Sequence, residues 1–236
     1  MMRRIIYIEG NIGTGKSTFV DKLNNYISKI IQEKKYTPTL VQEPVDEWMT
    51  TRDSDGNNIL EKFYSDQQRW AFTFQMNSFI SRAHRIEEQC DSIKNTSIQS
   101  NTCPLVLAER SIYTDRFCFA KNCYDNGNMT KLEYDVYCKW NDWLSNKFKL
   151  RPNAYIYLRC LPEENILRIK KRSRDGECDI PKKYLEMLHN LHDEWMGNEK
   201  KTIPVLTIDA MQNFHDETVM NKIFEEVNDF IHSLDN

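Results

Sequence analysis

Short apolar runs alternate along the chain with longer stretches in which apolar residues recur every three or four positions. The short runs have the length and residue types of strands, and they lie at residues 4–8, 39–42, 105–108, 154–158 and 204–208. None of them alternates strictly between apolar and polar residues, which is typical of strands covered on both faces. The pattern therefore predicts a parallel sheet between two layers of helices.

The longer stretches predict helices at residues 17–34, 66–95, 111–122, 131–148, 162–172, 181–197 and 216–234. Two polar segments, 49–58 and 95–102, are expected to be loops. No internal repeat or low-complexity tract divides the chain, so we expect a single α/β domain over residues 1–236.

The first predicted strand is followed by a segment that matches the pattern G-x-x-x-x-G-K-[ST] in full. Its residues are Gly10, Asn11, Ile12, Gly13, Thr14, Gly15, Lys16 and Ser17. Between a strand and a helix this pattern predicts a phosphate-binding loop, because the glycines let successive N–H groups face an anion. Lys16 would reach the outer phosphates of a nucleoside triphosphate, and Ser17 would bind Mg²⁺. The alternative is an ordinary glycine-rich turn.

Two of the predicted strands end in a carboxylate: Glu43 follows the second strand, and Glu109 follows the third. Because ligands bind outside the carboxyl ends of parallel strands, Glu109 is a candidate for Mg²⁺ and Glu43 for accepting a proton from an attacking hydroxyl. Arg110 would hold Glu43 and the charge that develops during transfer. The alternative for Glu109 is a cap or ion pair at a strand end, and Asp46 and Glu47 are expected to be solvated loop charges.

Residues 168–174 include five basic residues. Beside a triphosphate site this run predicts an arginine-bearing lid at about residues 170–180, because planar guanidinium groups match phosphate oxygens. Gly176 would allow such a loop to flex. A solvated helix end and a nuclear-localisation patch are the alternatives.

Polar and aromatic residues on two predicted helices could form an acceptor site. Spacing places Gln75, Ser78 and Arg82 on one face of the first helix, and Asp115 and Phe119 on one face of the second. If the two faces meet, they could bind a planar base by hydrogen bonds and stacking. The alternative is an ordinary ion pair between helices.

Composition narrows the function classes. The formal net charge of −3 argues against bulk binding of nucleic acid, and no apolar stretch is long enough to cross a membrane. The first predicted strand begins at residue 4, so we expect no signal or transit peptide. The seven cysteines are scattered without a C-x-x-C spacing, which favours reduced thiols in the cytoplasm over disulfides or zinc.

Six blocks of the sequence, taken in order, resemble the cellular deoxynucleoside kinases, which include deoxycytidine, deoxyguanosine and mitochondrial thymidine kinases and the insect multisubstrate enzyme. The blocks are residues 8–12 with the rest of the phosphate loop, 43–45 with Trp48, 69–75, 109–113, 180–181 with 184–185, and 205–209. They extend through nearly the whole chain.

The resemblance implies a five-stranded parallel sheet in the order 2-3-1-4-5, an arginine-bearing lid and a homodimer. It also implies transfer of the γ-phosphoryl group of ATP, with Mg²⁺, to the 5′-hydroxyl of a deoxynucleoside. Carried over by position, Glu43 is the general base and Arg110 lies beside the 5′ oxygen. Lys16 and Ser17 serve the phosphates and the metal, and Glu109 assists the metal.

The same carry-over gives the rest of the site. The side that binds the phosphate donor ATP also includes Thr18 and the lid arginines Arg168, Arg172 and Arg174. Asp209 and Phe214 would lie around the adenine. The acceptor side comprises Trp48, Phe63, Tyr64, Phe74, Gln75, Ser78, Arg82, Asp115, Phe119 and Glu177. Gln75 would bind the base edge with Phe119 stacked on the base, and Tyr64 and Glu177 would hold the sugar 3′-hydroxyl. Because Asp175-Gly176-Glu177 stands where relatives usually have two adjacent acidic residues, Asp175 could share the sugar.

Relatives that prefer deoxycytidine or purines share the pair Arg82 and Asp115, whereas thymidine acceptors tend to have small or apolar residues there. The expectation is therefore purine deoxynucleosides and deoxycytidine over thymidine. The alternative is a thymidine-preferring or broad-specificity enzyme. A nucleoside monophosphate kinase and a catalytically silent relative are less favoured, because the acceptor side lacks an arginine cluster and the chain keeps Lys16 and Glu43.

Overall fold

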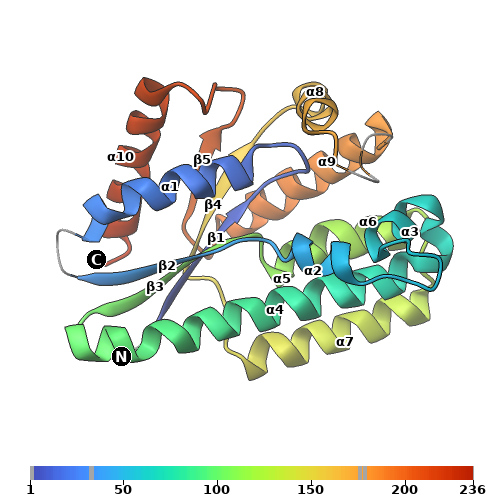
Figure 1. Cartoon of the computed structure of the whole chain (residues 1–236), viewed down its shortest axis with the longest axis horizontal. Helices are drawn as coiled ribbons and strands as arrows, with labels where there is room; N and C mark the ends of the chain where they lie inside the picture. The colour runs from blue at the N-terminus through green and yellow to red at the C-terminus, as the bar shows by residue number, and fades with distance from the viewer. Residues whose placement is uncertain (1–2, 32–34, 175–176, 178–179, 236) are drawn as a thin grey trace.

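The five strands form one parallel sheet in the order β2-β3-β1-β4-β5, as predicted (Figure 1). The computed structural model describes residues 3–31, 35–174, 177 and 180–235. The strands are β1 (Arg4–Glu9), β2 (Tyr36–Val41), β3 (Cys103–Glu109), β4 (Ala154–Arg159) and β5 (Val205–Asp209). Only β2 begins well before its predicted first residue.

The central strands are apolar throughout because they are buried on both faces. In β1, Ile5 and Tyr7 contribute to one hydrophobic core, while Ile6 and Ile8 contribute to a second core on the other face of the sheet. This double burial explains the missing alternation of apolar and polar residues.

Helices cover both faces (Figure 1). One face packs against α1 (Lys16–Ile31) and α10 (Glu217–Ser233); the other packs against α4 (Gln67–Ser100), α8 (Pro162–Arg172) and α9 (Lys182–Glu199). A third core joins the first half of α4 to α2 (Val45–Thr50), α3 (Ile59–Ser65), α6 (Lys121–Asp125) and α7 (Lys131–Lys147). In Figure 1, α4 and α7 run side by side below the sheet.

The predicted loop at 95–102 is wrong for most of its length, because α4 continues to Ser100. The polar residues there lie on a largely exposed helix end, with Ser97 buried, and Asn101 ends the helix in a left-handed conformation. Helices α2 and α3 were not predicted. Asn58 starts α3 with a capping box that includes Glu61, a local signal inside a segment read as loop. The predicted end of the first helix, residues 32–34, lies outside the described residues.

The predicted helix at 111–122 is not one regular α-helix. A single α-turn, α5 (Ile112–Thr114), leads into a π-helix, η1 (Asp115–Ala120), which continues as α6. The wider turn of a π-helix is found frequently at functional sites. Its position matters because Asp115 and Phe119 both lie on it.

Six of the cysteines lie in the described part of the chain; Cys90, Cys118, Cys123, Cys138 and Cys160 are free thiols, and Cys178 lies outside the described residues. No helix within the described ranges combines the length and the apolar character needed to cross a bilayer.

A buried histidine on α9 makes the stability of the fold sensitive to acid. His192 is fully buried, its Nδ1 lies 2.7 Å from the Leu188 carbonyl oxygen, and its ring stacks on Tyr157. Burial lowers the pKa of His192 to about 3, although the hydrogen bond to Leu188 opposes this shift. As the pH falls below 6.5, the ordinary pKa of histidine, His192 becomes protonated in the unfolded chain but stays neutral in the folded protein. Protonation therefore favours the unfolded state, and the free energy of unfolding falls.

We expect this group to cost about 2 kcal/mol of unfolding free energy between pH 7 and pH 5, because 1.4 kcal/mol accompanies each pKa unit. Urea unfolding at the two pH values measures it, and His192→Gln should lessen the loss. The control is His84→Gln, an exposed histidine on α4, which should keep the wild-type difference. An equal acid sensitivity of wild type and His192→Gln would contradict the assignment.

Candidate active site

The glycine-rich segment forms a tight loop between β1 and α1. Gly13 has a φ of +78°, and a Cβ atom there would lie 2.7 Å from the backbone oxygen of Asn165 on α8. Gly10 is confined in the same way by the Leu158 carbonyl oxygen of β4, at 2.6 Å. The loop therefore lies directly against its neighbours, and glycine is required by space as well as by backbone angle.

The lysine of the loop is buried. Lys16 Nζ donates to the Asn11 carbonyl oxygen at 2.7 Å. The Asn11 side chain holds the loop in turn, donating to the Leu185 carbonyl and accepting from the Ile12 N–H. Burial, with a contribution from the nearby Arg110, lowers the pKa of Lys16 to about 7. A cation held at this cost is stabilised by an anion that enters beside it.

Oxygen ligands suited to Mg²⁺ meet next to the loop. Ser17 Oγ donates to Glu109 Oε1 at 3.0 Å, which joins the start of α1 to the end of β3. A hydroxyl and a carboxylate are hard oxygen donors of the kind that Mg²⁺ takes alongside phosphate oxygens. In the described part of the chain, no group of three or more His, Cys, Asp or Glu side chains could hold a metal by itself. The pair therefore fits a metal that is shared with a phosphate group.

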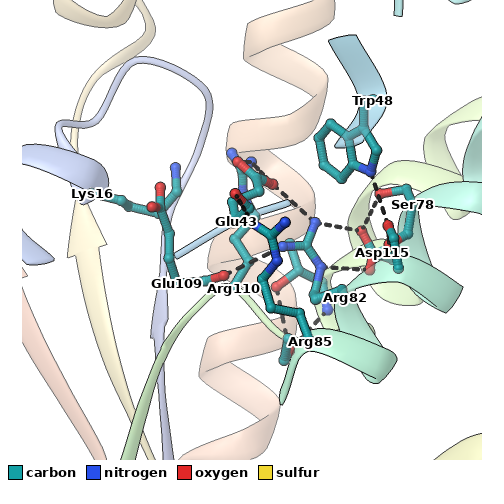
Figure 2. Close-up of polar contacts among 12 residues, drawn as sticks. Lys16, Glu43, Trp48, Ser78, Arg82, Arg85, Glu109, Arg110 and Asp115 are labelled. Carbon is teal, nitrogen blue, oxygen red and sulfur yellow. Dashed lines mark hydrogen bonds and ion pairs between the residues drawn. The ribbon is translucent and has the colours of Figure 1, made fainter. Parts of the chain in front are cut away.

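Glu43, just beyond β2, lies between two guanidinium groups (Figure 2). Arg110 Nη1 donates to both of its oxygens, at 2.7 and 3.0 Å, and Arg82 Nη2 donates to Oε1 at 2.9 Å. Burial alone would raise the pKa of Glu43, but the charges of Arg110, Arg82 and Lys16 together hold that pKa well below its usual range. The carboxylate is therefore ionised and can only accept hydrogen bonds.

The two helix faces that could bind a base do meet. Arg82 forms two hydrogen bonds to Asp115, Nε to Oδ2 at 2.8 Å and Nη2 to Oδ1 at 3.1 Å, and Ser78 Oγ donates to Asp115 at 3.2 Å. Arg82 is thus shared between Asp115 and Glu43. The Arg110 guanidinium carbon lies over the Phe119 ring, 4.9 Å from the centre of the ring.

The side chain of Gln75 is buried in the same region. Its Nε2 lies 4.0 Å from Cys123 Sγ, and its Oε1 has no hydrogen-bond partner among the described residues. Nearby, the Trp48 indole N–H donates to Ser81 at 2.9 Å, and Phe63 stacks on Phe74. An unsatisfied amide beside aromatic side chains is what recognition of a planar polar ring requires.

A single cavity of about 690 Å³ joins these parts. It is lined by most of the expected site residues: Ile12, Gly13, Gly15, Lys16, Ser17, Thr18, Glu43, Trp48, Phe63, Tyr64, Phe74, Gln75, Ser78, Arg82, Glu109, Arg110, Asp115, Phe119, Arg168, Arg172, Arg174, Glu177 and Phe214. Four expected residues do not line it: Gly10, Asn11, Thr14 and Asp209. Thr14 donates to the Asn11 carbonyl within the loop, and the Asn11 side chain is turned to Leu185 on α9. Asp209 instead accepts from the Met211 N–H at 2.9 Å.

The cavity also has lining residues that the sequence did not indicate. They are Leu60, Glu164, Leu167, Lys171, Tyr184, Met211, Asn213 and His215. Met211, Asn213 and His215 lie on the loop after Asp209, where Phe214 was the one residue expected to contact adenine. Tyr184 belongs to a family block, but its place in a cavity had no signal in local spacing.

The arginines of the basic run converge on the cavity from α8 and the segment after it. Arg168 Nη1 donates to the Thr14 carbonyl at 3.0 Å, which fastens α8 to the phosphate loop. Arg172 and Arg174 both pair with Glu177. Glu177 therefore lies at the cavity already engaged by two cations, whereas Asp175 and Gly176 lie outside the described residues.

Two exposed carboxylates differ from expectation. Asp46 and Glu47 are not merely solvated: Arg85 on α4 pairs with both, at 2.7 and 2.5 Å. Its Nη1 also donates to the Glu43 carbonyl oxygen at 3.4 Å. These contacts tie the start of α2 to α4 beside the buried ion pairs.

The arrangement has the parts of a phosphoryl-transfer site. One end of the cavity offers a glycine-rich loop, a buried lysine and the two oxygen donors of Ser17 and Glu109. The other end offers a carboxylate and a pocket with an amide, an Arg–Asp pair and aromatic rings. Phosphoryl transfer needs positioning and charge stabilisation more than covalent chemistry from the protein, and these groups supply both.

Comparison with known proteins agrees with the geometry. A model of the family "Deoxynucleoside kinase" matches residues 6–232. Bovine deoxycytidine kinase (Bos taurus) is 34% identical over 97% of this chain and 91% of its own length. Human deoxycytidine kinase (Homo sapiens) is 35% identical with the same coverage. Mitochondrial thymidine kinase 2 from Macaca fascicularis is 32% identical over 99% of this chain and 80% of its own length.

The close approach of α8 to the phosphate loop gives a test of the loop. In Gly13→Ala the new Cβ would press on the Asn165 carbonyl oxygen, and we expect ATP affinity to fall about tenfold, the effect of one to two kcal/mol of overpacking. Gly127→Ala is the matched control, since Gly127 has a similar φ of +73° but nothing within 4 Å of its Cβ position. Isothermal titration calorimetry measures both, and equal affinities would contradict the packing argument.

Proposed function

This chain belongs to the deoxynucleoside kinase family, and from that premise we propose how its residues phosphorylate the 5′-hydroxyl of a deoxynucleoside with ATP. The observation that carries the proposal is the position of Glu43. It lies in one cavity with the phosphate loop and with the Arg82–Asp115 pocket, so a single bound nucleoside can reach both.

In this proposal Glu43 orients the 5′-hydroxyl and accepts its proton while the hydroxyl oxygen forms a bond to the γ-phosphorus and ADP leaves. The low pKa of Glu43 keeps it ionised, and therefore able to accept, until the proton is transferred. A weak base suffices, because the transition state is loose and the proton moves late. Arg110, whose Nη1 lies 2.7 Å from Glu43 Oε1, would stabilise the negative charge on the transferring phosphoryl group.

On the donor side, Lys16 and the lid arginines Arg168, Arg172 and Arg174 would neutralise phosphate charge. Mg²⁺ would be held by Ser17 and Glu109, and its role when bound is to neutralise the phosphates during transfer. Support for this comes from the 3.0 Å contact between the two side chains. Phe214 and its loop would contact adenine.

On the acceptor side, Gln75 and the Arg82–Asp115 pair would bind the base edge, with Phe119 stacked on the ring and Trp48, Phe63 and Phe74 closing the pocket. Tyr64 and Glu177 would bind the sugar 3′-hydroxyl. Burial, with the nearby Glu177, raises the pKa of Tyr64, so its hydroxyl stays protonated and can donate.

The general-base proposal predicts the effect of Glu43→Gln. The amide keeps the shape but cannot take the proton, so we expect kcat to fall by a factor on the order of 10²–10⁴ while the KM for ATP changes little. Steady-state kinetics with ATP, Mg²⁺ and deoxycytidine measure this. Asp46→Asn, three residues away and on the exposed start of α2, is the control and should keep wild-type kcat. An active Glu43→Gln enzyme would overturn the assignment.

We further propose a preference for purine deoxynucleosides and deoxycytidine over thymidine. An arginine held by Asp115 can donate to an acceptor on cytosine or a purine, and it crowds the 5-methyl group of thymine. We expect kcat/KM for thymidine to be lower by about tenfold or more, the range that one lost polar contact or one crowded methyl group gives. A panel of the four natural deoxynucleosides measures it, with dCMP and dTMP included. An equal or higher kcat/KM for thymidine would contradict the proposed preference. Turnover of the monophosphates alone would indicate a monophosphate kinase.

A homodimer through α7 is also part of the proposal. Leu132, Trp140 and Trp143 are exposed on this helix, with 74%, 46% and 51% of their surface accessible, and a hollow lies between Val136 and the two indoles. Burying these side chains against a second copy would remove a large apolar area from water.

The cytoplasmic location expected from the scattered cysteines stays part of the proposal, and cell fractionation tests it.

The dimer proposal predicts that Trp140→Glu/Trp143→Glu is a monomer in sedimentation equilibrium where the wild type is a dimer. A charge reversal at an exposed lysine on α10, which packs on the opposite face of the sheet, is the control: Lys222→Glu should not change the mass. A wild-type monomer at micromolar concentration would rule the interface out.

A further inference from the structure

One buried carboxylate near the site does not touch the cavity. Glu9 is the last residue of β1, directly before the phosphate loop, and its side chain is completely buried. Oε1 accepts from Ser111 Oγ at 2.6 Å, and Oε2 accepts from Thr114 Oγ1. Burial raises the pKa of Glu9, and the two hydroxyl groups and the charges of Arg110 and Arg82 oppose that rise. Burying a carboxylate costs free energy, and an apolar side chain would fill the same space without that cost.

The first hydroxyl that Glu9 binds belongs to a helix cap. Ser111 Oγ accepts from the backbone N–H groups of Tyr113 and Thr114, each at 3.2 Å. With its lone pairs facing these donors, the hydroxyl hydrogen must go to another acceptor, and Glu9 supplies it. The carboxylate therefore fixes the direction of the cap that begins α5.

The residue before this cap is Arg110, which has a left-handed backbone with φ +61°. A non-glycine residue is rarely found there, and the strain persists only where neighbours hold it. On one side the Arg110 N–H donates to the Ile8 carbonyl at 2.9 Å. On the other side the chain is held by the Glu9–Ser111 contact. This backbone turn aims the Arg110 guanidinium at Glu43.

The second hydroxyl belongs to Thr114, the residue before the π-helix η1. The wide turn of η1 presents Asp115 toward Arg82 and Phe119 toward Arg110. The two oxygens of Glu9 thus hold the two ends of the short segment between Arg110 and Asp115.

We infer that Glu9 is a positioning residue for phosphoryl transfer: through Ser111 it sets Arg110 at the transferring group, and through Thr114 it sets Asp115 and Phe119 at the base. This inference rests on the proposed function of those three residues. Because Glu9 does not line the cavity, it acts only through them.

The test is Glu9→Gln, which keeps the volume but replaces one acceptor oxygen by a donor. We expect kcat to fall about tenfold or more, as for a reacting group displaced by a fraction of an ångström, while the KM for ATP changes less than about twofold. The preference for deoxycytidine over thymidine should shrink in the same variant. The destabilised control is Val227→Ala, a buried truncation on α10 at the opposite face of the sheet, which should lower the melting temperature and leave kcat unchanged.

A second pair of variants separates the base side. Thr114→Val removes the hydroxyl at nearly constant shape and should raise the deoxynucleoside KM, whereas Thr114→Ser keeps the hydroxyl and should restore it. This pair decides the question if Glu9→Gln does not fold.

The outcomes are distinguishable. Wild-type kcat and preference in a folded Glu9→Gln enzyme, or equal KM values in Thr114→Val and Thr114→Ser, would overturn the inference. A wild-type protein that phosphorylates no deoxynucleoside would instead overturn the proposed function.

Discussion

The site depends on a buried set of charges that can only exist together. Glu43, Arg82, Arg110 and Asp115 are all buried or nearly so, and each forms at least one ion pair with another member of the set. Removing any one from water costs several kcal/mol that its partners must offset. They come from four segments of the chain, so the set forms only when the sheet, α4 and η1 are assembled. Its geometry is a property of the whole fold.

The order of the strands explains why those segments meet. Strand β3 lies between β2 and β1, and Ile8 of β1 pairs with Glu109 of β3. Because the strands are parallel, the phosphate loop, Glu43 and Glu109 all emerge at the same edge. Helix α4 packs against β2 and β3 from Ala83 onward, and it supplies Arg82 to the same point. Topology places the charges, and side-chain hydrogen bonds refine the placement.

Sequence reasoning predicted the part of the site that is local. The phosphate loop has a fixed spacing, and Glu43 and Glu109 could be placed because each directly follows a predicted strand. The meeting of Arg82 with Asp115 could be offered only as one alternative, since helix spacing carries no information about which helices touch. The sharing of Arg82 between Asp115 and Glu43, and the contact of Glu9 with Ser111, depend on tertiary packing that no local pattern encodes.

The prediction of secondary structure was wrong at two segments, the polar end of α4 and the π-helix η1. The polar end of α4 was predicted to be a loop because exposed helix ends tolerate the residues that loops use. The π-helix was predicted to be α-helical, because hydrophobic spacing over six residues does not distinguish the two.

Helix α4 imposes a constraint on length. It runs unbroken for 34 residues, and along it lie Gln75, Arg82 and, further on, the residues that pack against the sheet. One residue added between Gln75 and Ile93 would rotate everything beyond it by about 100° relative to everything before it. The α4 side chains that line the cavity and those that pack against the sheet could then no longer face their partners at once. Insertions should be tolerated in the exposed turns at 54–57 and 126–127, whereas the length of α4 is fixed by the partners along it.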